Sequence, residues 1–336
     1  MSVRELSSVP SFPAIWAAAL GRPPLVPRAT SLPKRRYRVR GVKVGAEQSA
    51  RFDHLVGAAA SDYVHPGLLH VLAFPVSLSL MAHPRFPFPL LGLVHVKNSI
   101  LQHRPVRVGE TVDVECSVRN IQPHRRGATF EAVSTLSADG QIVATDVSTY
   151  LARGETARKI AALQEEEGAS ADGSRSEDRA AKREEFQPPK PSARWKLNGD
   201  TGRRYAAVAG DANPIHMSAL SAKAFGFPKA IAHGMYTASR AFAEARPDLS
   251  VPLKWDVEFA APVLIPGTVW LSFENDDSSR VYGARGHAGG AESGSAAGAG
   301  SASGGGRRVT RFTGFSAPKP DRPSKLHFTG TVELFG

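Results

Sequence analysis

The sequence predicts an α+β protein in which an antiparallel sheet wraps around a central apolar helix, and it predicts this arrangement twice. Three observations support this fold class. Long segments alternate apolar and polar residues, each half contains one nearly all-apolar helical segment, and the two halves share a pattern. A helix that is apolar on every side needs burial on every side, which the curl of a sheet provides.

The first half, residues 1–151, contains five segments with the period-2 alternation of strands. They are residues 37–44, 94–102, 111–120, 128–137 and 141–152, for example "TVDVECSVRN" and "QIVATDVSTYLA". The second half, residues 194–336, repeats the plan. It has strands at 194–197, 253–260, 268–275, 308–315 and 325–335, a short helix at 201–208 and an apolar helix at 233–245.

Two segments do not fit either half. Residues 152–193 are charged, mixed in sign and rich in proline at their end, which predicts a linker. Within them, 155–167 is expected to form at most a transient exposed helix. Residues 283–306 are a Gly/Ala/Ser tract, which predicts a flexible insertion between two strands.

The two halves match each other at two places in the same order. "FDHLVG" from Phe52 has the aromatic-to-glycine spacing of "YAAVAG" from Tyr205. "RPVRVGETVDVECSV" from Arg104 parallels "APVLIPGTVWLSFE" from Ala261. Two matches in one order argue against chance and indicate a duplication.

Composition limits the possible partners. The formal charge of +11 favours anionic partners, but no nucleic-acid-binding motif accompanies it, so no nucleic-acid partner is expected. The single cysteine, Cys116, suits a reducing compartment. No apolar run reaches the length of a membrane span, and prolines interrupt the N-terminal apolar patch. We therefore expect a cytoplasmic protein without a transmembrane helix.

The densest cluster of chemically useful residues lies between Tyr205 and Met235. Taken alone, "GDANP" is an ordinary turn sequence, and Asp211 would be a capping or turn residue in most proteins. His216 alone would more often be a loop histidine than a base. Asp211 and His216 are five residues apart with Pro214 between them, so we expect a rigid loop to direct both side chains inward.

"YAAVAGDANPIH" followed by "FGFPKAIAHGM" resembles the signature of the MaoC-like, (R)-specific enoyl-thioester hydratases, also called hydratase 2. These proteins have the hotdog fold. The duplicated layout is similar to the double-hotdog members, especially actinobacterial 3-hydroxyacyl-thioester dehydratases. The resemblance implies reversible syn addition or removal of water across C2–C3 of an acyl-CoA or acyl-carrier-protein thioester in fatty-acid metabolism.

The resemblance also implies roles for individual residues. Asp211 and His216 would share one water and move its protons, while the main-chain N–H of Gly234 would stabilise the thioester oxygen. Residues expected to support the site are Tyr205, Gly210, Asn213, Pro214 and His233. No metal or resident cofactor is expected, because the sequence shows no ligand spacing; coenzyme A or phosphopantetheine belongs to the substrate. A homodimer is a further expectation.

The first half departs from this pattern. Ungapped alignment places Ala58, Ala60 and Tyr63 opposite Asp211, Asn213 and His216, so this half has neither the acid nor the base. We expect it to complete the sheet and to shape an acyl tunnel, with a reduced central helix that leaves room for the chain. Residues 68–81 and 86–91 either line that tunnel or belong to the core. The alternatives are a catalytically silent thioester-binding partner and a nucleic-acid or lipid-surface binder.

Overall fold

The strands predicted from alternation are confirmed. The computed structural model describes residues 2–21, 29–168, 185–277, 308–318 and 323–335. In the first half it contains β1 (Ser2–Leu6), β2 (Arg35–Lys43), β3 (Val94–Gln102), β4 (Thr111–His124), β5 (Gly127–Ala138) and β6 (Gln141–Arg153). In the second half it contains β7 (Ala193–Leu197), β8 (Leu253–Phe259), β9 (Gly267–Asp277), β10 (Arg308–Phe315) and β11 (Leu326–Leu334). The sequence analysis missed β1.

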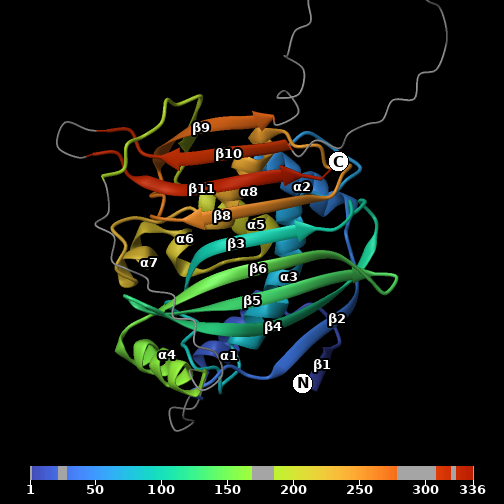
Figure 1. Ribbon diagram of the computed structural model, residues 1–336, viewed down its shortest axis with the longest axis vertical. Helices are drawn as coiled ribbons and strands as arrows, with labels where there is room; N and C mark the ends of the chain where they lie inside the picture. Colours follow the sequence, from blue (N-terminus) through green and yellow to red (C-terminus); the bar gives the residue numbers. More distant parts are fainter. Residues whose placement is uncertain (1, 22–28, 169–184, 278–307, 319–322, 336) are drawn as a thin grey trace, which may run out of the picture.

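The two halves share one sheet, which the first half completes as expected. The eleven strands follow the order β1-β2-β4-β5-β6-β3-β8-β11-β10-β9-β7 (Figure 1). Antiparallel pairing of β3 with β8 joins the halves, in register from Lys97 opposite Glu258 to Gln102 opposite Leu253. The pairing of β1 with β2 is parallel. Alternation predicts a strand but not its neighbour, so the joining edge was not predictable.

Four helices lie behind the sheet in Figure 1: α2 (Ala46–Val56), α3 (Pro66–Met81), α5 (Thr201–Ala209) and α8 (Gly234–Ala245). The central helices α3 and α8 lie on the inner side of their halves. The expectation of a reduced central helix in the first half is wrong, because α3 has 16 residues and α8 has 12. Helix α3 begins with a side-chain cap from His65, and Pro66 occupies its first helical position. Pro75 lies inside the helix.

His65 connects the two central helices. Its Nδ1 accepts a hydrogen bond from the N–H of Gly67 at 2.9 Å, and its Nε2 donates to the main-chain oxygen of Ser239 in α8 at 3.2 Å. The ring also packs on Phe242 of α8 at 4.7 Å and on Trp255 of β8 at 6.1 Å between centroids. The core therefore continues from one half into the other.

Four further helices surround this framework. They are α1 (Phe12–Leu20), α4 (Glu155–Gly168), α6 (Pro214–Met217) and α7 (Ala219–Ala224). The sequence analysis did not predict α1, whose Phe12 packs on Phe74 of α3 at 5.8 Å. It treated 155–167 as an exposed part of the linker. That description is wrong, because Ala157, Ile160 and Ala161 of α4 are buried and the helix contacts β4 and β5. Residues 169–184 of the linker and the whole glycine tract, 283–306, lie outside the described residues.

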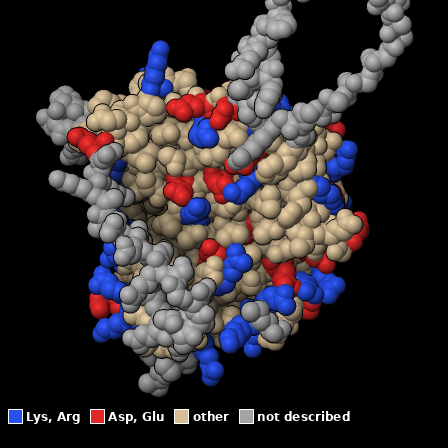
Figure 2. Space-filling view, viewed as in Figure 1, with Lys and Arg blue, Asp and Glu red and all other residues tan. Residues whose placement is uncertain are grey.

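The charge of the described surface is mixed. Figure 2 shows acidic and basic side chains interspersed on the outer face of the sheet. Three arginines of β2 are paired with acids: Arg36 and Arg38 contact Glu115, with Arg36 Nη1 2.7 Å from the carboxylate, and Arg40 contacts Glu5. None of the described helices is long and apolar enough to cross a membrane.

The shared core predicts cooperative unfolding. Truncating the fully buried Phe242 to alanine removes contacts with His65 and Trp255 and should cost about 3–5 kcal/mol in one transition that includes both halves. Urea unfolding followed by far-UV circular dichroism measures this. Leu220→Ala is the control, because Leu220 is 82% exposed, and should change stability by less than about 0.5 kcal/mol. Two separate transitions, or a Phe242→Ala cost below about 1 kcal/mol, would contradict the shared core.

Candidate active site

The turn after α5 positions Asp211. Gly210 ends the helix with φ 77°, a left-handed conformation that glycine adopts without strain. Oδ1 of Asp211 then accepts a hydrogen bond from the N–H of Asn213 at 3.2 Å. Asn213 caps α6 through the N–H of Ile215 at 3.4 Å, and Pro214 takes the first helical position. The expected rigid loop therefore passes directly into a one-turn helix.

His216 lies on α6, and its ring stacks on the ring of His233. Their centroids are 3.6 Å apart with an interplanar angle of 26°. Nδ1 of His216 is 2.8 Å from the main-chain oxygen of Ile231. A carbonyl only accepts, so Nδ1 carries the hydrogen and Nε2 of the neutral ring keeps a lone pair. In the same way, Nε2 of His233 donates to the main-chain oxygen of Asp211 at 2.9 Å.

The acid and the bases converge. One carboxylate oxygen of Asp211 and one ring nitrogen from each of His216 and His233 all lie within 4.8 Å of one another. A water that makes two ordinary hydrogen bonds at a tetrahedral angle spans about 4.6 Å. The site can therefore hold one water between a carboxylate and an imidazole.

Burial sets the protonation of these groups. It lowers the pKa of His216 to about 3, with a further lowering from His233 and an opposing effect from the Asp211 carboxylate. It also lowers the pKa of His233 to about 3. Burial raises the pKa of Asp211, against the opposing effect of His216, although its side chain is still 16% exposed. The histidines are therefore neutral near pH 7, and the basicity of the carboxylate is increased.

The remaining predicted residues lie around this group. Gly234 is the first residue of α8, so its N–H has no partner within the helix. A Cβ atom at Gly234 would lie 3.0 Å from the Phe259 ring, so only glycine leaves this approach open. Tyr205 packs its ring on His233 at 4.7 Å, and burial raises the pKa of its hydroxyl. Tyr63, the first-half counterpart of His216, does not line the cavity; it packs under Arg107.

A cavity of ≈ 260 Å³ opens onto Asp211, His216 and Gly234. Both halves line it. Both first-half segments that were expected to line an acyl tunnel contribute apolar side chains to the cavity. They are Val71, Phe74, Leu78 and Met81 of α3, and Leu90. Phe86 and Phe88 are buried core residues instead.

The chain is similar to proteins of known family. Residues 181–290 match the family model described as MaoC like domain. The chain is 32% identical to 3-hydroxyacyl-thioester dehydratase X of Mycobacterium tuberculosis over 260 residues, which is 77% of this chain and 87% of that protein. The chain belongs to the MaoC-like dehydratase family.

Solved structures agree on the fold of this MaoC-like dehydratase. A crystal structure of HtdX from Mycobacterium tuberculosis superposes with a TM-score of 0.61 and 27% identity, covering 89% of this chain and 99% of that one. A Mycobacterium tuberculosis protein described as having a double hotdog fold gives a TM-score of 0.51 at 15% identity, covering 88% and 93%. The predicted double hotdog is confirmed.

The sequence analysis of this MaoC-like dehydratase missed several cavity residues. Trp16 of α1 lines the cavity, as do His70 of α3, His95 of β3 and Tyr150 of β6. The sequence of β6 contains a pattern that indicates one of these residues, Tyr150. In β6, alternation directs Asp146, Ser148 and Tyr150 inward, and polar residues at inward positions of a strand are unusual.

The expectation that no ligand cluster forms in this MaoC-like dehydratase is wrong. Asp211, His216 and His233 do form a cluster that could hold an ion, although their spacing along the chain does not suggest one. Two of the ring nitrogens nevertheless donate hydrogen bonds to the main-chain oxygens of Ile231 and Asp211. The other nitrogen of each ring, Nε2 of His216 and Nδ1 of His233, keeps its lone pair.

Buried histidines predict acid sensitivity of the fold. Burial lowers the pKa of four histidines to about 3: His65, His95, His216 and His233. In the unfolded chain they titrate near pH 6.5, so below that pH the unfolded state binds more protons. Burial raises the pKa of Asp53 to about 6 and also raises that of Asp211, which opposes the effect. The four histidines outweigh the two carboxyl groups, so stability falls as the pH drops below about 6.5, by on the order of a few kcal/mol per pH unit.

Urea unfolding at pH 7, 6 and 5 measures this loss. His65→Gln should make the slope shallower, by on the order of 1 kcal/mol per pH unit. His103→Gln should leave it unchanged, because His103 is exposed. A stability that stays constant or rises between pH 7 and 5 would contradict neutral buried histidines.

Proposed function

We propose that this MaoC-like dehydratase is an (R)-specific enoyl-thioester hydratase and 3-hydroxyacyl-thioester dehydratase. It adds water across C2–C3 of a 2-enoyl thioester, and it removes water in the reverse direction. The observation that supports this most directly is the convergence of Asp211 and a neutral His216 within reach of one water. The relative from Mycobacterium tuberculosis carries the name of the same reaction.

The geometry supports a single-water mechanism. The water lies between the Asp211 carboxylate and Nε2 of His216, the ring nitrogen that retains its lone pair. One of the two groups takes a proton as the oxygen attacks C3, and a proton from this pair reaches C2 on the same face, which gives syn addition. The closely coupled pair acts as one acid–base unit. The stacked His233 fixes the orientation of the His216 ring.

The thioester oxygen needs a separate partner. Negative charge develops on it as the water attacks, and a preorganised main-chain donor in a dry site stabilises that charge by several kcal/mol. The N–H of Gly234 at the start of α8 is suited to this role, because the helix leaves it unpaired and no Cβ blocks the approach. The Phe259 ring lies next to this position.

The silent-partner alternative would retain the cavity without the chemistry. The intact Asp211 and His216 group disfavours it. Two observations disfavour a nucleic-acid or lipid-surface binder. Arg36 and Arg38 of β2 are paired with Glu115, and the outer face of the sheet carries acidic and basic side chains interspersed. Acyl-CoA or an acyl-carrier-protein thioester is therefore the proposed partner. A homodimer and a cytoplasmic location complete the proposal, the latter suiting the free, buried Cys116.

Substituting the acid or the base tests the assignment. Asp211→Asn and His216→Ala should each lower kcat for crotonyl-CoA hydration by at least about 100-fold, because each removes a proton-transfer group. Loss of the enoyl absorbance measures the rate, and chiral analysis should find the (R)-3-hydroxy product. Lys223→Ala, on the surface helix α7, is the matched control. Unaltered turnover in both variants with folding retained, or an (S) product, would refute the proposal.

We also propose that the reaction needs no metal. The proton transfers described above use the Asp211 carboxylate and Nε2 of His216 directly, so no step requires a metal. Dialysis against EDTA followed by the same assay should leave kcat unchanged. Loss of activity that Zn²⁺ or Mg²⁺ restores would assign the Asp211, His216 and His233 group to a metal instead.

A further inference from the structure

The first half contributes polar side chains to the cavity in addition to the apolar ones. His70 of α3, His95 of β3 and Tyr150 of β6 line the cavity that also opens onto Asp211 and His216. We call these three residues the first-half polar cluster. The mechanism proposed above does not use them.

A buried hydrogen-bond network holds one member of the cluster in place. Nδ1 of His70 donates to Oδ2 of Asp146 at 2.7 Å. Asn98 donates to the other oxygen of Asp146 at 2.8 Å, and Ser148 donates to Asn98 at 2.7 Å. His70 and the three network residues are all at most 5% exposed. A buried polar network costs stability when any member lacks a hydrogen-bond partner. In this network each residue has one.

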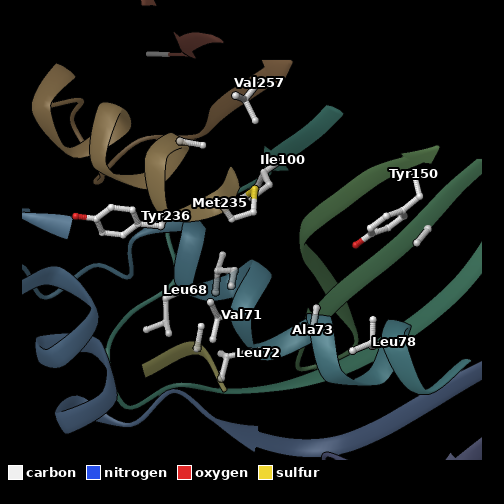
Figure 3. Close-up of a cluster of buried hydrophobic side chains, with 14 of the residues drawn as sticks. Leu68, Val71, Leu72, Ala73, Leu78, Ile100, Tyr150, Met235, Tyr236 and Val257 are labelled. Carbon is white, nitrogen blue, oxygen red and sulfur yellow. The ribbon is translucent and has the colours of Figure 1, made fainter. Parts of the chain in front are cut away.

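The other two members of the cluster are not satisfied. Oη of Tyr150 and Nε2 of His95 are buried and have no hydrogen-bond partner. Ser148 is near enough to affect the pKa of Tyr150, but it lies out of hydrogen-bond geometry and gives its hydrogen to Asn98. Figure 3 shows the Tyr150 hydroxyl directed away from its strand, into the interior. Buried polar atoms without partners are rare in proteins, so a ligand atom is a reasonable partner here.

The two unsatisfied groups lie together and close to the site of the reaction. The rings of His95 and Tyr150 stack with their centroids 4.9 Å apart. His95 also packs on Phe259 at 5.4 Å, and the same Phe259 ring lies against Gly234. One aromatic ring therefore separates the cluster from the proposed thioester-oxygen site.

We propose that the first-half polar cluster binds an oxygen substituent, a hydroxyl or keto group, on the acyl chain of the substrate. This proposal rests on the proposed function. A hydroxyl could accept a hydrogen from Tyr150 and donate to Nε2 of His95; a keto oxygen could accept from Tyr150. A plain alkyl chain would leave both groups unpaired. The cluster is bordered by apolar residues such as Val71, Phe74 and Leu78, which suit the rest of the chain.

Matched acyl chains test the proposal. The substrates are 2-enoyl-CoA thioesters of one chain length, either unsubstituted or with one hydroxyl or keto group at carbon 5, 6 or 7. At one position the wild-type protein should show a kcat/KM about 10-fold or more above that of the unsubstituted chain. The hydroxyl and keto arms distinguish the two forms of oxygen.

Variants assign the preference to the cluster. Tyr150→Phe should remove most of the preference, bringing kcat/KM for the oxygenated chain close to that for the unsubstituted chain. His95→Phe, which keeps a stacked ring, should reduce the preference as well and serves as the second variant if the first does not fold. Tyr236→Phe is the matched control, because Tyr236 is equally buried but does not line the cavity, and it should retain the preference.

Three results would overturn the inference. Turnover of the unsubstituted chain with no preferred oxygen position would mean that ordered water or nothing satisfies the cluster. A loss in Tyr150→Phe that is equal for all substrates would assign Tyr150 a structural role. Absence of turnover with every thioester would refute the proposed function itself, and this inference with it, which separates that failure from the first two.

Discussion

The stacking of His216 on His233 is the contact on which the candidate site depends. The two ring centroids are 3.6 Å apart, so charging both imidazoles would cause strong repulsion. One N–H of each ring donates a hydrogen bond to a main-chain oxygen. Desolvation and stacking thus favour the neutral form of both rings. A neutral His216 beside a carboxylate of raised pKa can accept and return a proton near neutral pH, which a solvated pair would do less well.

Local patterns in the sequence were sufficient for ten of the eleven described strands. Period-2 alternation located ten strands, because each has one buried face and one exposed face. The segment around Asp211 was recognisable because loop chemistry, an acid, a base and a helix-starting glycine lie within 24 residues of one another. The roles of its residues came from the resemblance of this segment to a family signature, because each residue alone fits an ordinary turn or loop.

Features that depend on contacts between distant segments were not predictable in this way. The pairing of β3 with β8 leaves no mark on either strand, since each alternates as any strand does. α4 was taken as exposed because its charged face outweighs Ala157, Ile160 and Ala161, which find their partners on β4 and β5. The clustering of Asp211, His216 and His233 depends on the fold that returns α8 to α6, so spacing along the chain gave no sign of it.

Joining both halves in one chain and one sheet has a consequence for how such a protein can change. Two identical copies in a symmetric dimer would be obliged to alter both inner surfaces whenever one of them altered. When both halves belong to one chain, a substitution changes the inner surface of one half only. The first half has no counterpart of Asp211 or His216, so the reaction does not constrain its inner surface in the same way. That surface can carry His70, His95 and Tyr150, while the second half must keep its acid and its base.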